Sequence, residues 1–258
     1  MTQQDDNIIY YRSIEIEVHR VLHLKEDTPK LMERGLTAWI SDVSSSLEKW
    51  YITTPPNAPI KIVLFRHLMY HYLKAKIYRP NPRIPTRTAT DRQMCFDVCQ
   101  RIIESGHALF EHKALTYSWQ TVHILFGAFV ILLEACWQYR SQSLIRPSAA
   151  HVLSVLIPQC LDFLGEIGKE WSEATLCKMC LHSMLEEVAQ SYNRVVVSGD
   201  TLTADDATAE KLRNLLFADR LRSDNTLSDE IALELEAQIL KHPMYSWDLE
   251  DVQWSSWC

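Results

Sequence analysis

Glycine is scarce in this chain, with six glycines among 258 residues. Folds built from strands and tight turns use glycine often, because glycine adopts a positive φ at no steric cost. The scarcity therefore disfavours sheet folds and favours helices with short connections. Hydrophobic residues make up 47% of the chain and charged residues 23%, which is ordinary globular usage. We expect an all-α fold, a single multi-helix domain with central apolar helices.

Positive charge is also in short supply. The formal net charge is −7, and no basic face stands out of the kind that recognises phosphates. We therefore expect no direct nucleic acid binding. The first residues, MTQQDDNIIYYRS, are acidic and polar, whereas a secretory signal needs a basic and then an apolar start. This start predicts an intracellular protein.

Long hydrophobic runs are missing as well. The most apolar stretch, Val122 to Trp137, is shorter than a membrane span and contains His123 and Glu134, so we expect a buried helix and no membrane partner. The seven cysteines are an odd number spread over apolar helices, which predicts reduced thiols. Cys177 and Cys180 have the spacing of a zinc or redox pair, but no further ligands accompany them, and we expect them in the core.

The chain has a clear helical periodicity in its apolar residues. Apolar residues recur at three- and four-residue steps, which predicts amphipathic helices. The predicted helices cover residues 8–24, 29–50, 60–78, 91–109, 117–139, 148–164 and 169–192. Pro29 suits a first helical turn, Thr88 to Thr90 offer caps, and Pro158 should kink its helix. Helix 60–78 runs into RPNPRIP, which must be an extended connection because its prolines cannot continue a helix.

Three regions follow from this pattern. Residues 1–195 form the helical domain, and residues 196–242 form a polar loop with two amphipathic helices. Residues 243–258 are an acidic-aromatic tail, in which three tryptophans alternate with acidic residues. Such tails dock on partners, so we expect either a protein partner for this segment or packing on its own domain.

Histidines on the apolar helices are the candidate polar site. His67 and His71 share one face of helix 60–78 with Tyr70 nearby, and His123 lies on helix 117–139. If these faces converge, they line a ligand pocket; otherwise each histidine is a hydrogen-bonded core residue. Zinc proteases with this histidine spacing place Glu after the first histidine, and Leu68 stands here, so we expect no metal. No phosphate loop or nucleophile elbow occurs, and we expect no cofactor.

The stretch LFRHLMYHYLKAKIYRPNPRIP, followed by a cysteine in DRQMCFDVCQRII, resembles the fungal-specific transcription factor domain. This domain is the all-helical middle homology region of zinc-binuclear-cluster regulators. The resemblance covers roughly residues 10–195 and rests on features in the family's order: Leu47 to Trp50 before Pro55, Tyr70-His71, Arg79-Pro80, Cys95, Trp119, Phe126-Gly-Ala and Trp171 to Ala174.

The resemblance implies a regulatory domain that binds effectors or partners. The six-cysteine zinc cluster of such regulators is missing, so a complete chain of this sequence should not grip DNA as its relatives do. We assign ligand binding to His71, Trp119 and Phe126. The expected partners are a small-molecule effector or substrate, a protein that binds the tail, and a second copy of the chain in a homodimer.

Two functions remain open. The first is a regulator-like effector- or partner-binding module in the nucleus, tied to a fungal biosynthetic pathway such as secondary metabolism. The second is a cytoplasmic, cofactor-independent isomerase or cyclase recruited from the regulator fold. In that enzyme His67 or His123 would act as general acid or base, and Tyr70 would orient the substrate. Fold resemblance does not decide between them, because function depends on the site.

Overall fold

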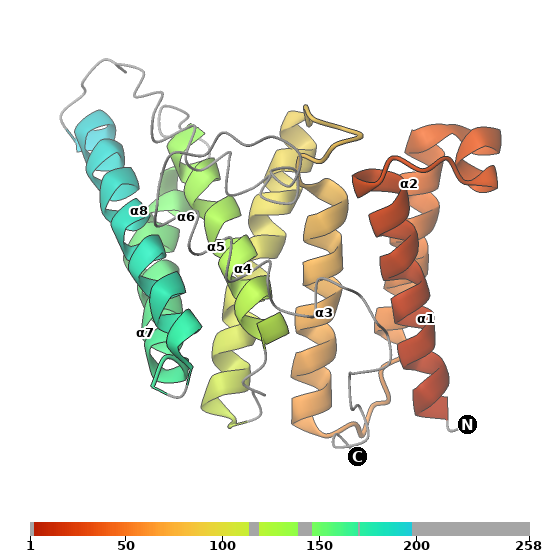
Figure 1. Ribbon diagram of the computed structural model, residues 1–258, viewed down its shortest axis with the longest axis horizontal. Coiled ribbons are helices and arrows are strands. Elements are labelled where there is room, and N and C mark those ends of the chain that lie inside the picture. Colours follow the sequence, from red (N-terminus) through yellow and green to blue (C-terminus); the bar gives the residue numbers. More distant parts are fainter. Residues whose placement is uncertain (1–2, 114–118, 139–145, 170, 198–258) are drawn as a thin grey trace.

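The computed structural model describes residues 3–113, 119–138, 146–169 and 171–197, and the regular secondary structure in these ranges is helical, with no strand (Figure 1). The prediction of an all-α fold is confirmed. The elements in chain order are α1 Gln3–Val18, a π-helical turn η1 His19–His23, α2 Pro29–Ile52, α3 Ile60–Tyr78, α4 Ala89–Glu111, α5 Trp119–Gln138, α6 Arg146–His151, a second π-helical turn η2 Val152–Leu156, α7 Ile157–Ile167 and α8 Ser172–Val197.

Local signals set several helix ends. The Thr28 side chain accepts a hydrogen bond from the Leu31 backbone N–H, with Pro29 in the first turn of α2. The Thr88 hydroxyl accepts one from the Asp91 N–H at 3.1 Å and begins α4. Inside α2 the predicted uninterrupted helix is wrong, because Gly35 has a φ of 77° and kinks it.

The helices stand side by side in a row (Figure 1). The pair α1 and α2 lies at one end, α3 and α4 follow, then α5, and α7 with α8 closes the other end. The most extensive contacts join α3 to α4 and α4 to α5, and α8 packs on both α5 and α7. The central position of α3, α4 and α5 agrees with the expected apolar centre.

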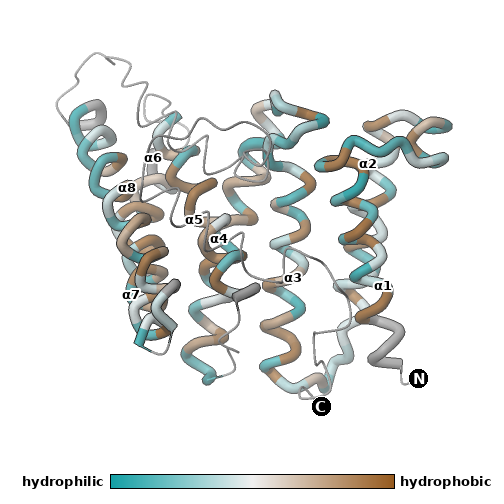
Figure 2. Tube along the Cα trace, in the orientation of Figure 1, coloured by the Kyte–Doolittle hydropathy of each residue, from teal (hydrophilic) through white to brown (hydrophobic). Residues whose placement is uncertain are grey.

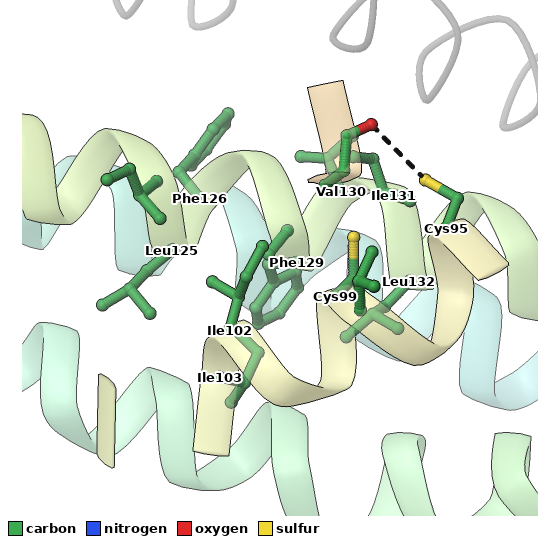
Figure 3. Close-up of a cluster of buried hydrophobic side chains, with 14 of the residues drawn as sticks. Cys95, Cys99, Ile102, Ile103, Leu125, Phe126, Phe129, Val130, Ile131 and Leu132 are labelled. Carbon is green, nitrogen blue, oxygen red and sulfur yellow. Dashed lines mark hydrogen bonds between the residues drawn. The ribbon is translucent and has the colours of Figure 1, made fainter. Parts of the chain in front are cut away.

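The core is densest around α5, where apolar residues are concentrated (Figure 2). Figure 3 shows side chains of α4 and α5 interleaved, with Phe129 next to Ile102, and Cys95 donating to the Ala75 carbonyl of α3. By length and hydropathy, Thr121–Gln138 and Ser148–Ile167 could each cross a bilayer, but 78% and 50% of their residues are buried within the protein. The apolar stretch of α5 is therefore longer than the segment Val122 to Trp137 that the sequence analysis considered, and it is a buried core helix, as expected.

The proline-rich connection after α3 is non-helical from Arg79 to Pro85, as predicted, and Tyr78 packs against the core. The kink predicted at Pro158 takes the form of the π-helical turn η2 just before it. Proline lacks an N–H and its ring collides with the carbonyl four residues back, and the wider turn relieves both problems. The predicted loop and helices of 196–242 and the tail of 243–258 lie outside the described residues beyond Val197, and stay predictions.

Candidate functional site

Three side chains form a continuous hydrogen-bonded chain between α2 and α3. The Tyr51 hydroxyl lies 3.0 Å from Nδ1 of His67, and Nε2 of His67 lies 2.8 Å from Nε2 of His71. The spacing of four residues puts both imidazoles on one face of α3, and the end of α2 supplies the tyrosine. The structure thus joins His67 to His71, two of the residues that the sequence singled out.

A second polar chain lies beside the first. The Tyr70 hydroxyl donates to Glu48 at 2.5 Å and accepts from the Lys74 ammonium at 3.0 Å. The two chains meet through their rings, because Tyr51 stacks on Tyr70 with ring centroids 4.4 Å apart. We call these six residues the α2–α3 polar cluster: Glu48, Tyr51, His67, Tyr70, His71 and Lys74.

Arg66 holds the end of α2 against α3 and so positions Tyr51. Its guanidinium lies 4.2 Å from the Trp50 ring centre, donates to the Trp50 carbonyl, and reaches the Thr54 hydroxyl at 2.8 Å. The last carbonyls of a helix have no partner within the helix, and a buried guanidinium can satisfy several acceptors at once. The corner between the two helices is therefore built around this arginine.

Both histidines of the cluster are neutral at pH 7. Burial, followed by the neighbouring His67 and Lys74, lowers the pKa of His71 to about 3. Burial and then the Arg101 charge lower the pKa of His67, against an opposing effect of Glu104. Burial and the hydrogen bond to Glu48 raise the pKa of Tyr70, so its hydroxyl keeps its proton.

The neutral chain has two proton arrangements. If Tyr51 donates to Nδ1 of His67, then His67 donates from Nε2 to His71; if Tyr51 accepts, the direction reverses along the chain. In either case Nδ1 of His71 is buried and without a hydrogen-bond partner. The hydrogen bonds between the hydroxyl and the two imidazoles can therefore run in either direction, and the chain ends at a buried nitrogen of His71.

The other predicted site residues lie elsewhere. His123 is half-buried on α5, a helix that packs mainly on α4 and makes a smaller direct contact with α3. Phe126 is 8% exposed and belongs to the hydrophobic core. Trp119 begins α5, and its side chain lies outside the described part. Their roles in catalysis or ligand binding stay predictions.

Sequence reasoning missed Glu48 and Tyr51. They lie in the last turns of α2, next to the Leu47 and Trp50 that it did single out. Polar residues at the end of an amphipathic helix usually face solvent, so the residue type alone does not indicate that they belong to a site. Their role follows only from the packing of α2 on α3.

The proline-rich connection ties α3 to η1. The Arg83 guanidinium donates to the Val21 carbonyl at 2.6 Å, to the Glu26 carbonyl at 3.0 Å and to the Asp27 carboxylate at 2.9 Å. Arg87 donates to the Ile77 and Arg79 carbonyls and so satisfies the end of α3. The abrupt stop after α3 thus has a structural purpose, which is to anchor the N-terminal elements.

His23 of η1 gives this region a pH dependence. Burial, and then the charges of Arg79, Lys76, His19 and Arg87, lower its pKa from 6.5 to about 2, and its Nε2 is buried without a partner. Between about pH 2 and 6.5, His23 is therefore protonated in the unfolded chain and neutral in the folded chain. The stability that His23 contributes is lost as pH falls below its unfolded pKa of 6.5.

Because the unfolded chain takes up a proton at His23, we expect the free energy of unfolding to fall by about 1.4 kcal/mol for each unit by which the pH drops below 6.5. Between about pH 6.5 and 5 the fall should amount to about 2 kcal/mol. Urea unfolding at several pH values measures it. His23→Gln should flatten the slope by that amount, since glutamine does not titrate. His182→Gln is the control, because that side chain is 57% exposed. Equal slopes for both variants and the parent chain would contradict this explanation.

The described histidines, carboxylates and cysteines do not form a metal centre of three or more ligands. None of the six described cysteines forms a disulfide, and burial raises the pKa of Cys136 and of Cys160 to about 12. Such thiols are poor nucleophiles. Cys177, one of the two in the Cys-x-x-Cys pair, is buried in the core, as expected.

Part of the chain is similar to a known regulatory protein of yeast. The chain is 26% identical over 120 residues to Pyrimidine pathway regulatory protein 1 of Saccharomyces cerevisiae (strain ATCC 204508 / S288c). The match covers 45% of this chain and 13% of that protein. No protein-family model matches the chain. No solved structure matches it either.

Proposed function

We propose that this chain is an effector- or partner-binding module of the fungal transcription regulator type. The observation that carries the proposal is the similarity to a yeast pathway regulatory protein, together with the ordered motifs of the fungal regulatory domain on an all-helical fold. As a regulator of this type, it would act in the nucleus. A biosynthetic pathway is the process we expect it to control.

The α2–α3 polar cluster supports a binding role. It combines neutral imidazoles, two tyrosine rings, a carboxylate and an ammonium on two adjacent helices. Ligand sites of this kind use a few polar groups with aromatic surface to fix a small molecule. A small-molecule effector would bind there, and the tail of 243–258 would contact a protein partner.

One observation favours the second candidate, a cofactor-independent isomerase or cyclase. The chain from Tyr51 through His67 to His71 can shift protons among one hydroxyl and two imidazoles. Neutral His67 could then serve as a general base at pH 7. In that case His67 and Tyr70 would act together.

A reporter assay tests the regulatory proposal. The full chain is fused to an unrelated DNA-binding domain in yeast, and transcription from its target promoter is measured. We expect more transcription than from the DNA-binding domain alone, because an acidic segment rich in aromatic residues can recruit partners. Replacing Trp247, Trp254 and Trp257 together by alanine should remove the increase.

The control replaces the half-buried Trp171 in the connection to α8, which is outside the tail. Trp171→Phe should keep the increase. A fusion that accumulates in the nucleus but leaves transcription unchanged would contradict the regulatory proposal and favour the enzyme.

A further inference from the structure

Two imidazole nitrogens converge on one face of α3. Nε2 of His67 and Nε2 of His71 lie 2.8 Å apart, and the ring centroids are separated by 4.4 Å. The ring planes are inclined by 50°, so the two nitrogens approach each other from successive turns rather than by stacking of their faces. Both residues are half-buried.

We propose that His67 and His71 form an open two-histidine site for a divalent transition metal such as Ni(II) or Cu(II). Two metal–nitrogen bonds of about 2.0–2.1 Å that meet at a right angle place their nitrogens about 2.9 Å apart. A tetrahedral angle would place them about 3.3 Å apart. The separation of 2.8 Å is that of neighbouring positions in a square-planar or octahedral ion rather than in tetrahedral zinc.

Tyr51 supplies the outer contact that such a ligand needs. Its hydroxyl lies 3.0 Å from Nδ1 of His67, and a proton held on Nδ1 leaves Nε2 free to bind metal. The tyrosine is itself held by stacking on Tyr70, and the Arg66 contacts fix the end of α2 from which it projects. The ring of His67 is therefore oriented before any metal arrives.

The charges around the pair do not forbid a cation. Besides burial, the positive charges of Lys74 on α3 and Arg101 on α4 lower the pKa values of the histidines. The negative charge of Glu104 on α4 has the opposite effect. Glu48 of α2 adds a second carboxylate through its bond to Tyr70. Two positive and two negative groups thus surround the site.

The site would be open rather than closed. Two histidines are its protein ligands in the described part of the chain, where no third His, Cys, Asp or Glu joins them. Water, or a donor atom of a bound small molecule, would fill the other positions. The absence of Glu after His67 argues against zinc-protease chemistry, because that Glu is the general base of those enzymes. Metal binding by the two histidine Nε2 atoms does not require it.

Calorimetric titration of the full chain with NiCl₂ tests the site. We expect one Ni(II) per chain with micromolar affinity. His67→Asn keeps a polar atom near the position of Nδ1 for Tyr51 but removes Nε2, and should weaken binding at least about tenfold, as should His71→Asn. Tyr51→Phe keeps both ligands and should weaken it about tenfold through loss of the outer contact. His182→Gln removes an exposed histidine and should change nothing.

Paramagnetic resonance of the unmodified chain with one equivalent of Cu(II) gives a readout that is independent of variant stability. We expect hyperfine splitting from two imidazole nitrogens. No saturable Ni(II) binding, unchanged binding in His67→Asn, or a Cu(II) signal without two nitrogen ligands would each overturn the proposal. The result bears on the metal site alone, since the reporter assay tests the tail and not these histidines.

Discussion

Replacing Asn81 by alanine is expected to lower the free energy of unfolding by about 1–3 kcal/mol. Asn81 lies between two prolines and is 1% exposed. Its Oδ1 accepts from the backbone N–H groups of Arg83 at 3.1 Å and Ile84 at 2.9 Å, and its Nδ2 donates to the Arg79 carbonyl at 3.2 Å. Alanine would leave the Ile84 N–H without its acceptor at a cost of about 1–3 kcal/mol, whereas the Arg83 N–H keeps the Leu22 carbonyl at 3.2 Å. Urea unfolding followed by circular dichroism measures the loss.

Asn57→Ala is the matched control, because Asn57 also follows prolines but is exposed in the connection between α2 and α3. We expect a change within about 0.5 kcal/mol there. A loss for Asn81→Ala no larger than for Asn57→Ala would show that the connection satisfies its backbone without this side chain.

The second large effect is expected at the centre of the row of helices. Phe129 of α5 is 0% exposed and packs among side chains of α4 (Figure 3). Phe129→Ala removes the whole buried ring and leaves a cavity that the neighbouring side chains fill only in part. We expect a loss of about 3–5 kcal/mol, measured by the same urea unfolding.

Met32→Ala in α2 controls for the loss of apolar side-chain atoms, since Met32 is 76% exposed. It should change the free energy of unfolding by less than about 0.5 kcal/mol. If Phe129→Ala behaved like Met32→Ala, α5 would not be the centre of the core.

Signals that act within a few residues were predictable. Thr28 with Pro29, and Thr88 three residues before Asp91, carry their capping chemistry in the chain itself. The bounds Ile60–Tyr78 of α3 were predicted because prolines lie on both sides. These helix ends need no knowledge of what the helices pack against.

Features that depend on contacts between helices were not predictable. The π-helical turns η1 and η2 have no residue type of their own, and the kink at Gly35 could equally have been a tolerated helical glycine. The partnership of Tyr51 with His67 depends on how α2 is laid against α3 by Arg66. Asn81 could have been found, because asparagine between prolines favours turns in which its side chain binds the backbone.

The order of the helices in the row has a consequence for how the protein is made. Contacts run mainly from α3 to α4 and from α4 to α5, so each of these helices meets its partner soon after both have left the ribosome. Closing a short loop costs little chain entropy, and proteins dominated by such local contacts fold quickly. The contact of α8 with α5 is the longer-range step, and it becomes available only once the chain has been synthesised through Val197. Synthesis would therefore complete the first helices as a partly folded unit, to which α7 and α8 are added last.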